Sequence, residues 1–303
     1  MPVTLRREVV ADIIRVALSG DDHRDIVIDL LDGAFVSYVI EFFEKIVYAK
    51  VRKRTITRDW YRDHFLDQRL DKSQFAWNGG LNMKTIKNKH KSERRQIVID
   101  EALGHYDKFL KLVDSLSDDR LNIDLSITFR DVTVHLDMNE SLVVINALAV
   151  RRAAFRGGFW STVGKQVEGP LMETLCRVYD VDKKYFTKAL AEDNSLREVD
   201  YHLLSPDGSK AKCEVKLMGV GNPESADAIH ARDTDVFVAS TLSETNRIQL
   251  DEAGVFWTEL QVSKGFLRFQ DTLANLGIPY AELDNGSDHA NRIERAIRQV
   301  LLL

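Results

Sequence analysis

The chain of 303 residues is long enough for one large domain or two ordinary ones, because single cores stop growing near about 250–300 residues. Its composition, 44% apolar and 29% charged, is typical of a globular protein and excludes a disordered chain. The longest apolar run, residues 142–150, is interrupted by Asn146 and is much shorter than the ~18 residues that a membrane span requires. We therefore expect neither a membrane protein nor a disordered one.

The formal net charge of −5 argues against a protein that coats nucleic acid through its bulk charge, although it leaves room for a local basic face. The first residues alternate charged and apolar side chains, so we expect no secretory leader. The two cysteines, Cys176 and Cys213, have neither metal-ligand spacing nor the density of a disulfide scaffold. These features indicate a protein of a reducing cytoplasm.

The first half of the chain is predicted to be mainly helical. Apolar residues at helical spacing predict helices over residues 3–18, 26–50 and 92–116, the last with Ser92 as its cap. Alternating apolar residues in 123–129 and 132–138 predict a β-hairpin that turns at Arg130-Asp131.

A further helix is predicted over residues 141–155, ending at Gly157-Gly158. This glycine pair is the predicted boundary between a mainly helical region, residues 1–157, and an α/β region, residues 158–303.

The second half has the pattern of a mixed α/β region. We expect a helix over 161–179, two strands around Pro206-Asp207-Gly208, and then a strand, helix and strand. These last three elements are expected at 235–240, 243–253 and 255–260, and two helices close the chain, the last near 288–302.

The hairpin of residues 197–217 carries the strongest functional signal. Side chains alternate between the two faces of a strand, so Glu214 and Lys216 share one face of the second strand. A three-residue loop at 206–208 pairs Ser205 with Ser209 and sets Asp200 opposite Glu214, whereas a two-residue loop would separate the polar faces. With an odd loop, Asp200, Glu214 and Lys216 converge on one side of the hairpin.

Two neighbouring carboxylates repel each other unless a cation lies between them. A hard divalent ion such as Mg²⁺ fits this arrangement, because it prefers oxygen ligands and keeps positions open for phosphate and water. A lysine beside the metal ion can orient a water molecule that attacks a phosphodiester, and it can offset the negative charge of the phosphate. The competing interpretation is that residues 198–216 form the ordinary solvated face of an amphipathic hairpin.

Asp200, followed across a hairpin by Glu214-Val215-Lys216, resembles the motif of the PD-(D/E)XK nuclease superfamily. The segment KCEVKLMGVGNPESADA (212–228) resembles, more narrowly, the CfrBI-like restriction endonucleases. The resemblance covers roughly residues 160–260 and implies an α/β (α+β) fold, with a restriction-endonuclease-like αβββαβ core. The sequence departs from the family pattern in having Val199 before Asp200. Its literal Pro-Asp, at 206–207, has the character of a hairpin turn.

The resemblance also implies the roles of individual residues in a type II restriction endonuclease. Asp200 and Glu214, with the Val215 carbonyl, would hold Mg²⁺, and Lys216 would act on the attacking water, leaving a 5′-phosphate and a 3′-hydroxyl. It further implies an acidic residue on the preceding helix. Gly164 followed by Glu168 has the family's spacing, and Glu173 is the rival. A homodimer is expected, because cutting both strands of a palindromic site calls for two symmetric active sites.

Basic clusters in residues 1–157 are the expected contacts to DNA, so this helical region is the expected DNA-clasping part and residues 158–303 are the expected catalytic core. Six cations lie within twelve residues, opposed only by Glu93: Lys84, Lys87, Lys89, Lys91, Arg94 and Arg95. Asparagines near them, Asn78, Asn82 and Asn88, could read adenine edges. Two smaller clusters are Lys50, Arg52, Lys53, Arg54 and Arg58, and Arg151, Arg152 and Arg156. A solvated charged surface is the alternative interpretation of each cluster taken singly.

The predicted function is therefore Mg²⁺-dependent, site-specific cleavage of double-stranded DNA in the cytoplasm of a bacterium or archaeon. Two alternatives remain open: a repair or recombination nuclease with the same core, and a catalytically silent DNA-binding protein that uses the basic clusters alone. A structural interaction protein is the remaining possibility, and the segregation of basic residues weighs against it.

Overall fold

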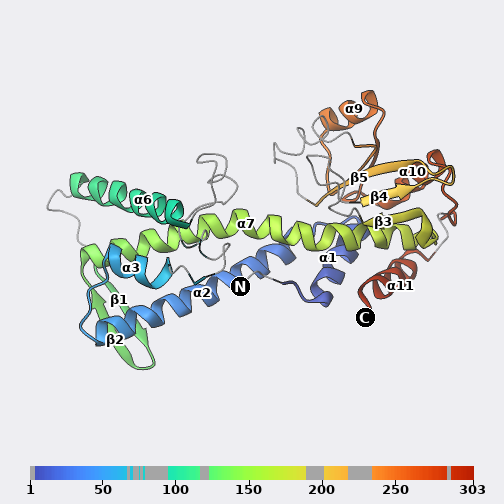
Figure 1. Ribbon diagram of the computed structural model, residues 1–303. Helices are drawn as coiled ribbons and strands as arrows, with labels where there is room; N and C mark the ends of the chain where they lie inside the picture. The colour runs from blue at the N-terminus through green and yellow to red at the C-terminus, as the bar shows by residue number, and fades with distance from the viewer. Residues whose placement is uncertain are drawn as a thin grey trace. The chain divides into compact units, whose positions relative to one another are not determined.

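The computed structural model describes residues 4–66, 69–70, 75, 78, 95–116, 123–188, 201–217, 234–284 and 288–303 (Figure 1). The chain separates into two compact units. We call Ile28–Ser161 the helical unit, and Thr4–Val27 together with Thr162–Leu303 the sheet unit.

The helical unit consists of helices and one small β-hairpin. Its described elements are most of α2 (Arg24–Val51), α3 (Arg58–Phe65), α6 (Arg95–Leu116), β1 (Leu125–Phe129), β2 (Val132–Leu136) and the first part of α7 (Met138–Val178). Three predictions are confirmed here: the helix over 26–50, the helix over 92–116, and the hairpin with its turn at Arg130-Asp131. Ser92, the predicted cap, lies outside the described residues.

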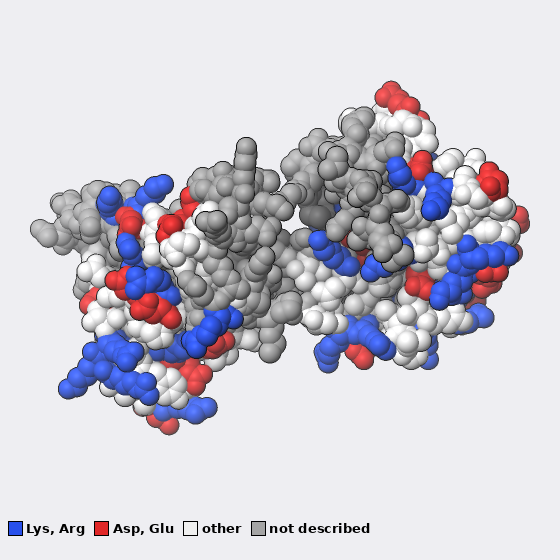
Figure 2. Space-filling model, viewed as in Figure 1, with Lys and Arg blue, Asp and Glu red and all other residues white. Residues whose placement is uncertain are grey.

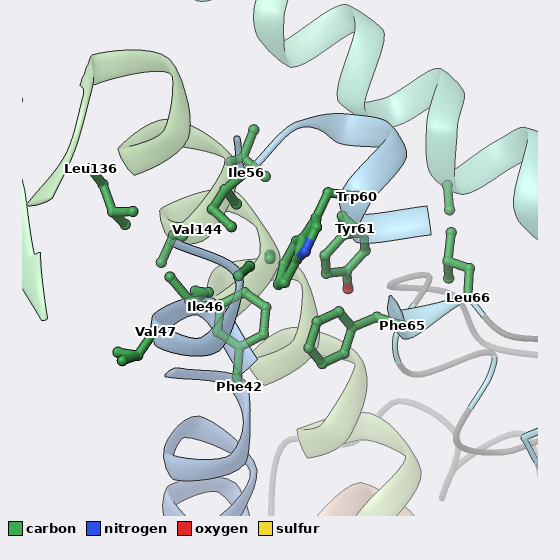
Figure 3. Close-up of a cluster of buried hydrophobic side chains, with 14 of the residues drawn as sticks. Phe42, Ile46, Val47, Ile56, Trp60, Tyr61, Phe65, Leu66, Leu136 and Val144 are labelled. Carbon is green, nitrogen blue, oxygen red and sulfur yellow. The ribbon is translucent and has the colours of Figure 1, made fainter. Parts of the chain in front are cut away.

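Aromatic side chains form the centre of the helical unit (Figure 3). Phe42 from α2 packs against Tyr61 and Phe65 from α3, with ring centroids 6.4 and 4.9 Å from its own. Helix α3 begins where Thr57 accepts a hydrogen bond from the backbone N–H of Trp60, an ordinary side-chain cap. The cap and the buried aromatic face together explain why this short segment is helical.

The predicted helix end at Gly157-Gly158 is wrong, because α7 runs unbroken from Met138 to Val178. A glycine inside a helix costs only about 1 kcal/mol relative to alanine. The adjacent Phe155 and Phe159 are buried one helical turn apart, with ring centroids separated by 5.6 Å. Burying each phenylalanine contributes roughly 1.5–3 kcal/mol, which outweighs the glycine penalty. Tertiary packing therefore overrides the local stop signal.

The sheet unit contains a five-stranded mixed sheet in the order β3-β4-β5-β6-β7. Its strands are β3 (Phe186–Lys188), β4 (Tyr201–Leu204), β5 (Lys210–Lys216), β6 (Val236–Ala239) and β7 (Phe256–Glu259). Strands β3, β4 and β5 are antiparallel neighbours, whereas β5, β6 and β7 are parallel. This mixed α+β architecture, with α7 before three antiparallel strands, confirms the predicted fold class.

The sheet unit also contains helices. They are α1 (Arg7–Ser19), the last part of α7, α9 (Glu244–Glu252), α10 (Phe269–Asn275) and α11 (His289–Leu301), with the short 3-10 segments η1 (Lys183–Tyr185) and η2 (Gly265–Arg268). The predicted helices at 243–253 and 288–302 are confirmed as α9 and α11.

The hairpin of β4 and β5 has the predicted register. Tyr201 lies opposite Cys213, and the Ser205 N–H donates to the Ser209 carbonyl at 2.9 Å. Gly208 has φ +89°, a left-handed conformation that glycine adopts without strain. The loop between the paired serines is thus the three-residue loop 206–208, which keeps the polar residues of both strands on one face.

Helix α1 belongs with the sheet unit, although the predicted division of the chain assigned residues 1–157 to the N-terminal region. It packs against α11 (Figure 1), and Arg15 on α1 forms an ion pair with Glu294 on α11 at 3.0 Å. The functional division at residue 157 stays a prediction. Among the described residues, no helix is both long and apolar enough to cross a membrane.

Candidate active site

The carboxyl end of β5 places a carboxylate and a lysine on the same face of the sheet. Glu214 and Lys216 are two residues apart on the strand, so their side chains point to the same side. Lys216 Nζ lies 2.6 Å from Glu214 Oε1, and the two side chains are 21% and 2% exposed. Because water is largely excluded, the electrostatic interaction of this pair is stronger than that of a surface ion pair.

The opposite face of β5 anchors the strand in the core. Ala211, Cys213 and Val215 are buried, and β4 contributes Tyr201 and Leu203 to the same side. The alternation predicted from the sequence is therefore confirmed for the described part of the hairpin. A rigidly packed strand holds Glu214 and Lys216 in fixed positions, which a catalytic site requires.

The structure describes only one of the two candidate aspartates of this hairpin. Asp200 lies outside the described residues, so its predicted place opposite Glu214 stays a prediction. Asp207 lies at the hairpin tip, where its carboxylate accepts a hydrogen bond from the Ser209 N–H at 2.8 Å. This hydrogen bond lowers the pKa of the Asp207 carboxyl. Asp207 has the role of a turn residue, as the sequence indicated.

Glu168, the helix acid chosen from the sequence, lies on α7 and is buried. A Cβ atom added to Gly164, one turn earlier, would come within 3.0 Å of Glu168 Oε1, so the carboxylate lies directly over this glycine. The glycine-then-glutamate spacing therefore has a physical cause, because Gly164 leaves room for the carboxylate. Glu173, the rival, is half-buried on the same helix.

The neighbouring parallel strands place another acidic residue at the same edge of the sheet. Lys216 pairs in register with Ala239, and Ala239 with Glu259. Glu259 is buried and accepts hydrogen bonds from the Leu242 N–H at 2.9 Å and from Arg247 at 2.7 Å. These bonds join the end of β7 to the start of α9. The sequence carried no signal for this residue, because its partners are 12 to 17 residues away.

The described donors at the end of β5 fit a hard metal ion. The Glu214 carboxylate and the Val215 carbonyl supply oxygen, the ligand type that Mg²⁺ prefers. In the part of the chain that the structure describes, no group of three or more His, Cys, Asp or Glu side chains could hold a metal. The ligand set predicted from the sequence includes Asp200, which lies outside that part.

Most of the predicted DNA-contacting cations lie outside the described residues: Lys84, Lys87, Lys89, Lys91 and Arg94. Arg95 is the first residue of α6. The asparagines Asn82 and Asn88 also lie outside, so the role of this cluster stays a prediction.

Arg151, by contrast, is an internal residue of the helical unit. It is 6% exposed, donates to Asn78 Oδ1 at 2.6 Å, and stacks over the Tyr38 ring at 4.4 Å. Asn78 in turn donates to the Phe65 carbonyl at 2.6 Å. These contacts join α2, α3, α7 and the segment that contains Asn78. In this structure, Arg151 and Asn78 hold the helical unit together and are not exposed to a ligand at the surface.

Other members of the two smaller clusters are paired with acids. Lys50 binds Glu140, Arg58 binds Asp107, and Arg152 binds Asp32. Exposed members are Arg52, Lys53, Arg54 and Arg156. On the face drawn in Figure 2, basic and acidic side chains lie close together on both units. Arg152, although near the surface, already has a carboxylate partner.

A comparison with protein families identifies one match. The model of the CfrBI restriction endonuclease family matches residues 7–247, which is well over half of the chain and includes Glu168, Glu214 and Lys216. Comparisons with curated proteins and with solved structures gave no match.

Proposed function

The chain belongs to the CfrBI restriction endonuclease family, and from that premise we propose that it cleaves double-stranded DNA at a specific, palindromic site in a Mg²⁺-dependent reaction. Membership of a restriction endonuclease family makes it a nuclease that acts on DNA. The observation that carries the finer proposal is the ion pair of Glu214 and Lys216 on one face of β5, at the carboxyl edge of the parallel strands.

The proposed reaction is hydrolysis of a phosphodiester by water. Lys216 orients the attacking water and offsets the charge that builds up on the phosphate oxygens. The water oxygen bonds to phosphorus and gives up a proton to solvent, the bond to the 3′ oxygen breaks, and that oxygen takes up a proton from solvent. The products are a 5′-phosphate and a 3′-hydroxyl.

Glu214 and the Val215 carbonyl, together with Asp200, would hold Mg²⁺. When bound, the ion supplies positive charge to the scissile phosphate and lowers the pKa of water. The buried Glu168 is the candidate either for the outer shell of this Mg²⁺ or for a ligand of a second metal ion. The first basic cluster and Arg152 are the proposed contacts to DNA phosphates, which position the duplex without reading its sequence.

We also propose that the enzyme acts as a homodimer. Exposed apolar residues on α2 support this: Val36, Ile40, Tyr48 and Val51 are each more than half exposed. Asp25 and Asp29 lie near one end of the helix, and Arg52 and Lys53 follow its other end. Antiparallel packing of two copies of α2 would cover the apolar residues and bring acids near bases. Light scattering should then give twice the mass of the chain, and a monomer at working concentrations would exclude this dimer.

Cys176 and Cys213 are buried and form no disulfide, which fits the proposed setting in the cytoplasm of a bacterium or archaeon.

The test of the proposed activity uses purified protein and a long linear DNA of diverse sequence, with Mg²⁺ or with EDTA. Discrete bands in Mg²⁺ alone are expected, and sequencing their ends would give the site and the terminal phosphates. A Mg²⁺-dependent smear would instead indicate a repair or recombination nuclease. A salt-sensitive mobility shift without cleavage would indicate a silent DNA-binding protein.

A further inference from the structure

The turn between α1 and α2 lies at the carboxyl edge of the central sheet, beside the strand that carries Glu214 and Lys216. Gly20 ends α1 with φ +89°, and a Cβ atom there would come within 2.6 Å of the Val262 carbonyl oxygen, in the loop after β7. Only glycine permits so close an approach in this conformation. The turn is therefore packed directly against the end of the sheet.

A second contact holds the same turn. The Arg24 guanidinium and, to a smaller extent, the Gln261 side chain hydrogen-bond to Asp22, and they hold the pKa of its carboxyl well below the usual range. Gln261 is the second residue after β7. Two contacts from the turn thus reach the segment that follows β7.

The third contact of the turn reaches the residue that directly follows β5. His23 is 2% exposed, and its Nε2 lies 3.1 Å from the carbonyl oxygen of Leu217, the residue that directly follows Lys216. The Lys216 carbonyl is still part of the sheet, where it accepts from the Ser240 N–H at 3.0 Å. Leu217 therefore has the first carbonyl beyond β5, and the donor for it is a side chain 194 residues away in sequence.

The chemistry of the ring defines this contact further. Burial lowers the pKa of His23, so the imidazole is neutral near pH 7. A neutral imidazole has one N–H, and a carbonyl can only accept, so the proton is on Nε2. His23 Nδ1 is buried and has no hydrogen-bond partner among the residues that the structure describes. Within that part of the chain, the Leu217 carbonyl is thus the single hydrogen-bond partner of the ring.

We infer that His23 is a positioning residue for the cleavage reaction, which fixes the backbone at the end of β5 and with it the Val215 carbonyl and the Lys216 side chain. This inference rests on the proposed function of β5. A carbonyl without a donor at this buried position would be destabilised, and the backbone would rotate toward another partner. A displacement of about 1 Å in a catalytic group can lower a rate by about 10²-fold.

The turn has supports that do not depend on His23. Leu5 N–H donates to Gln166 on α7 at 2.8 Å, and Arg15 on α1 pairs with Glu294 on α11 at 3.0 Å. Gly20 remains packed on Val262. Removing the His23 side chain should therefore change the end of β5 locally and leave the sheet unit folded.

The test compares His23→Ala, His23→Gln and the control His289→Ala in the full-length protein. Glutamine keeps an N–H donor near the position of Nε2. His289 also contacts a backbone carbonyl, that of Asp284 at 2.8 Å, but it is only partly buried and is distant in sequence from β5. Single-turnover cleavage in Mg²⁺ and DNA affinity in EDTA are measured for each, with hydrogen exchange of the amides of residues 215–217.

For His23→Ala we expect the cleavage rate constant to fall at least tenfold, DNA affinity to change less than twofold, and exchange at 215–217 to rise. His23→Gln should restore the rate to within about threefold of the wild type, and His289→Ala should match the wild type. A wild-type rate in His23→Ala, or glutamine no better than alanine, would overturn the inference. If the wild type itself does not cleave, the proposed function fails, and unchanged exchange in His23→Ala would separately overturn the positioning role.

Discussion

The helical unit and the sheet unit each contain a buried glutamate paired with a lysine, and the two pairs have nearly the same local geometry. Lys50 Nζ lies 2.6 Å from Glu140, with side chains 23% and 2% exposed, and Lys216 Nζ lies 2.6 Å from Glu214, with side chains 21% and 2% exposed. Distance and burial therefore do not distinguish the structural pair from the pair that we propose to be catalytic.

The surroundings of the two pairs do distinguish them. Glu140 accepts hydrogen bonds from the N–H groups of Ile56 and Asp137 at 2.9 and 3.1 Å, and Asp137 accepts from the Glu140 N–H in return. This reciprocal pattern is a capping box at the start of α7. Glu140 thus joins three chain segments, whereas Glu214 and Lys216 are neighbours on one strand at the edge where parallel strands end. The proposed catalytic role of Glu214 and Lys216 therefore rests on their position in the fold, and not on the ion pair itself.

The largest effect is expected from Glu214→Gln. Replacing one carboxylate oxygen by an amide removes a ligand for the proposed Mg²⁺ and should lower the cleavage rate by about 10³-fold, the range typical of losing a catalytic group. Binding to DNA in EDTA should be retained, because the duplex contacts are unchanged. Cleavage at the wild-type rate would mean that Glu214 has no part in the mechanism. Its ion pair with Lys216 would then be structural, like that of Glu140 with Lys50.

The second largest effect separates the two aspartates of the hairpin. Asp200→Asn should weaken both Mg²⁺ binding and cleavage, because it removes the second predicted carboxylate. Asp207→Asn should change cleavage less than twofold, since Asp207 bonds within its own turn. A Mg²⁺ titration of the cleavage rate for both variants is the measurement, and the reverse pattern would move the metal-binding role to Asp207.

For the structural pair, Glu140→Gln should lower the free energy of unfolding by about 3 kcal/mol, because a donor replaces an acceptor in a buried, charged cluster. The matched control is Glu41→Gln, whose exposed pair with Lys45 on α2 contributes less than about 1 kcal/mol. Denaturant unfolding measures both. Equal stabilities of the two variants would mean that the Glu140 cluster is not a structural centre.

The smallest and most graded effect concerns the first basic cluster. Replacing Lys87, Lys89 and Lys91 together by alanine should weaken DNA binding and reduce the salt slope by ~0.9 for each phosphate that the protein no longer neutralises. Affinity measured at several salt concentrations gives this slope. An unchanged slope would mean that this cluster is a solvated charged surface that does not contact DNA.

Local signals made the hairpin of β4 and β5 predictable. Pro206-Asp207-Gly208 indicated a tight turn, and with the three-residue loop the alternation of residues on both strands determined which side chains share a face. The continuity of α7 through Gly157-Gly158 was not predictable in the same way, because a glycine pair is a stop signal only where no buried side chains continue the helix.

Contacts between distant segments were the part that the sequence did not reveal. His23 meets Leu217 across 194 residues, and Lys50 meets Glu140 across 90. Arg151 was expected to contact DNA because it belongs to a basic cluster with Arg152 and Arg156, but its partners Tyr38 and Asn78 lie far away in the chain. Periodicity describes which face a residue occupies and not which segment covers that face.

The most direct test of the central claim is the Mg²⁺-dependent cleavage of one DNA by Lys216→Ala and Lys50→Ala, side by side, at a temperature where both are folded. We expect Lys216→Ala to lose cleavage by at least about 10²-fold while it still binds DNA. Lys50→Ala should cleave at the wild-type rate despite a lower melting temperature. Cleavage at the wild-type rate by Lys216→Ala, or its loss in folded Lys50→Ala, would contradict the assignment of the catalytic pair to β5.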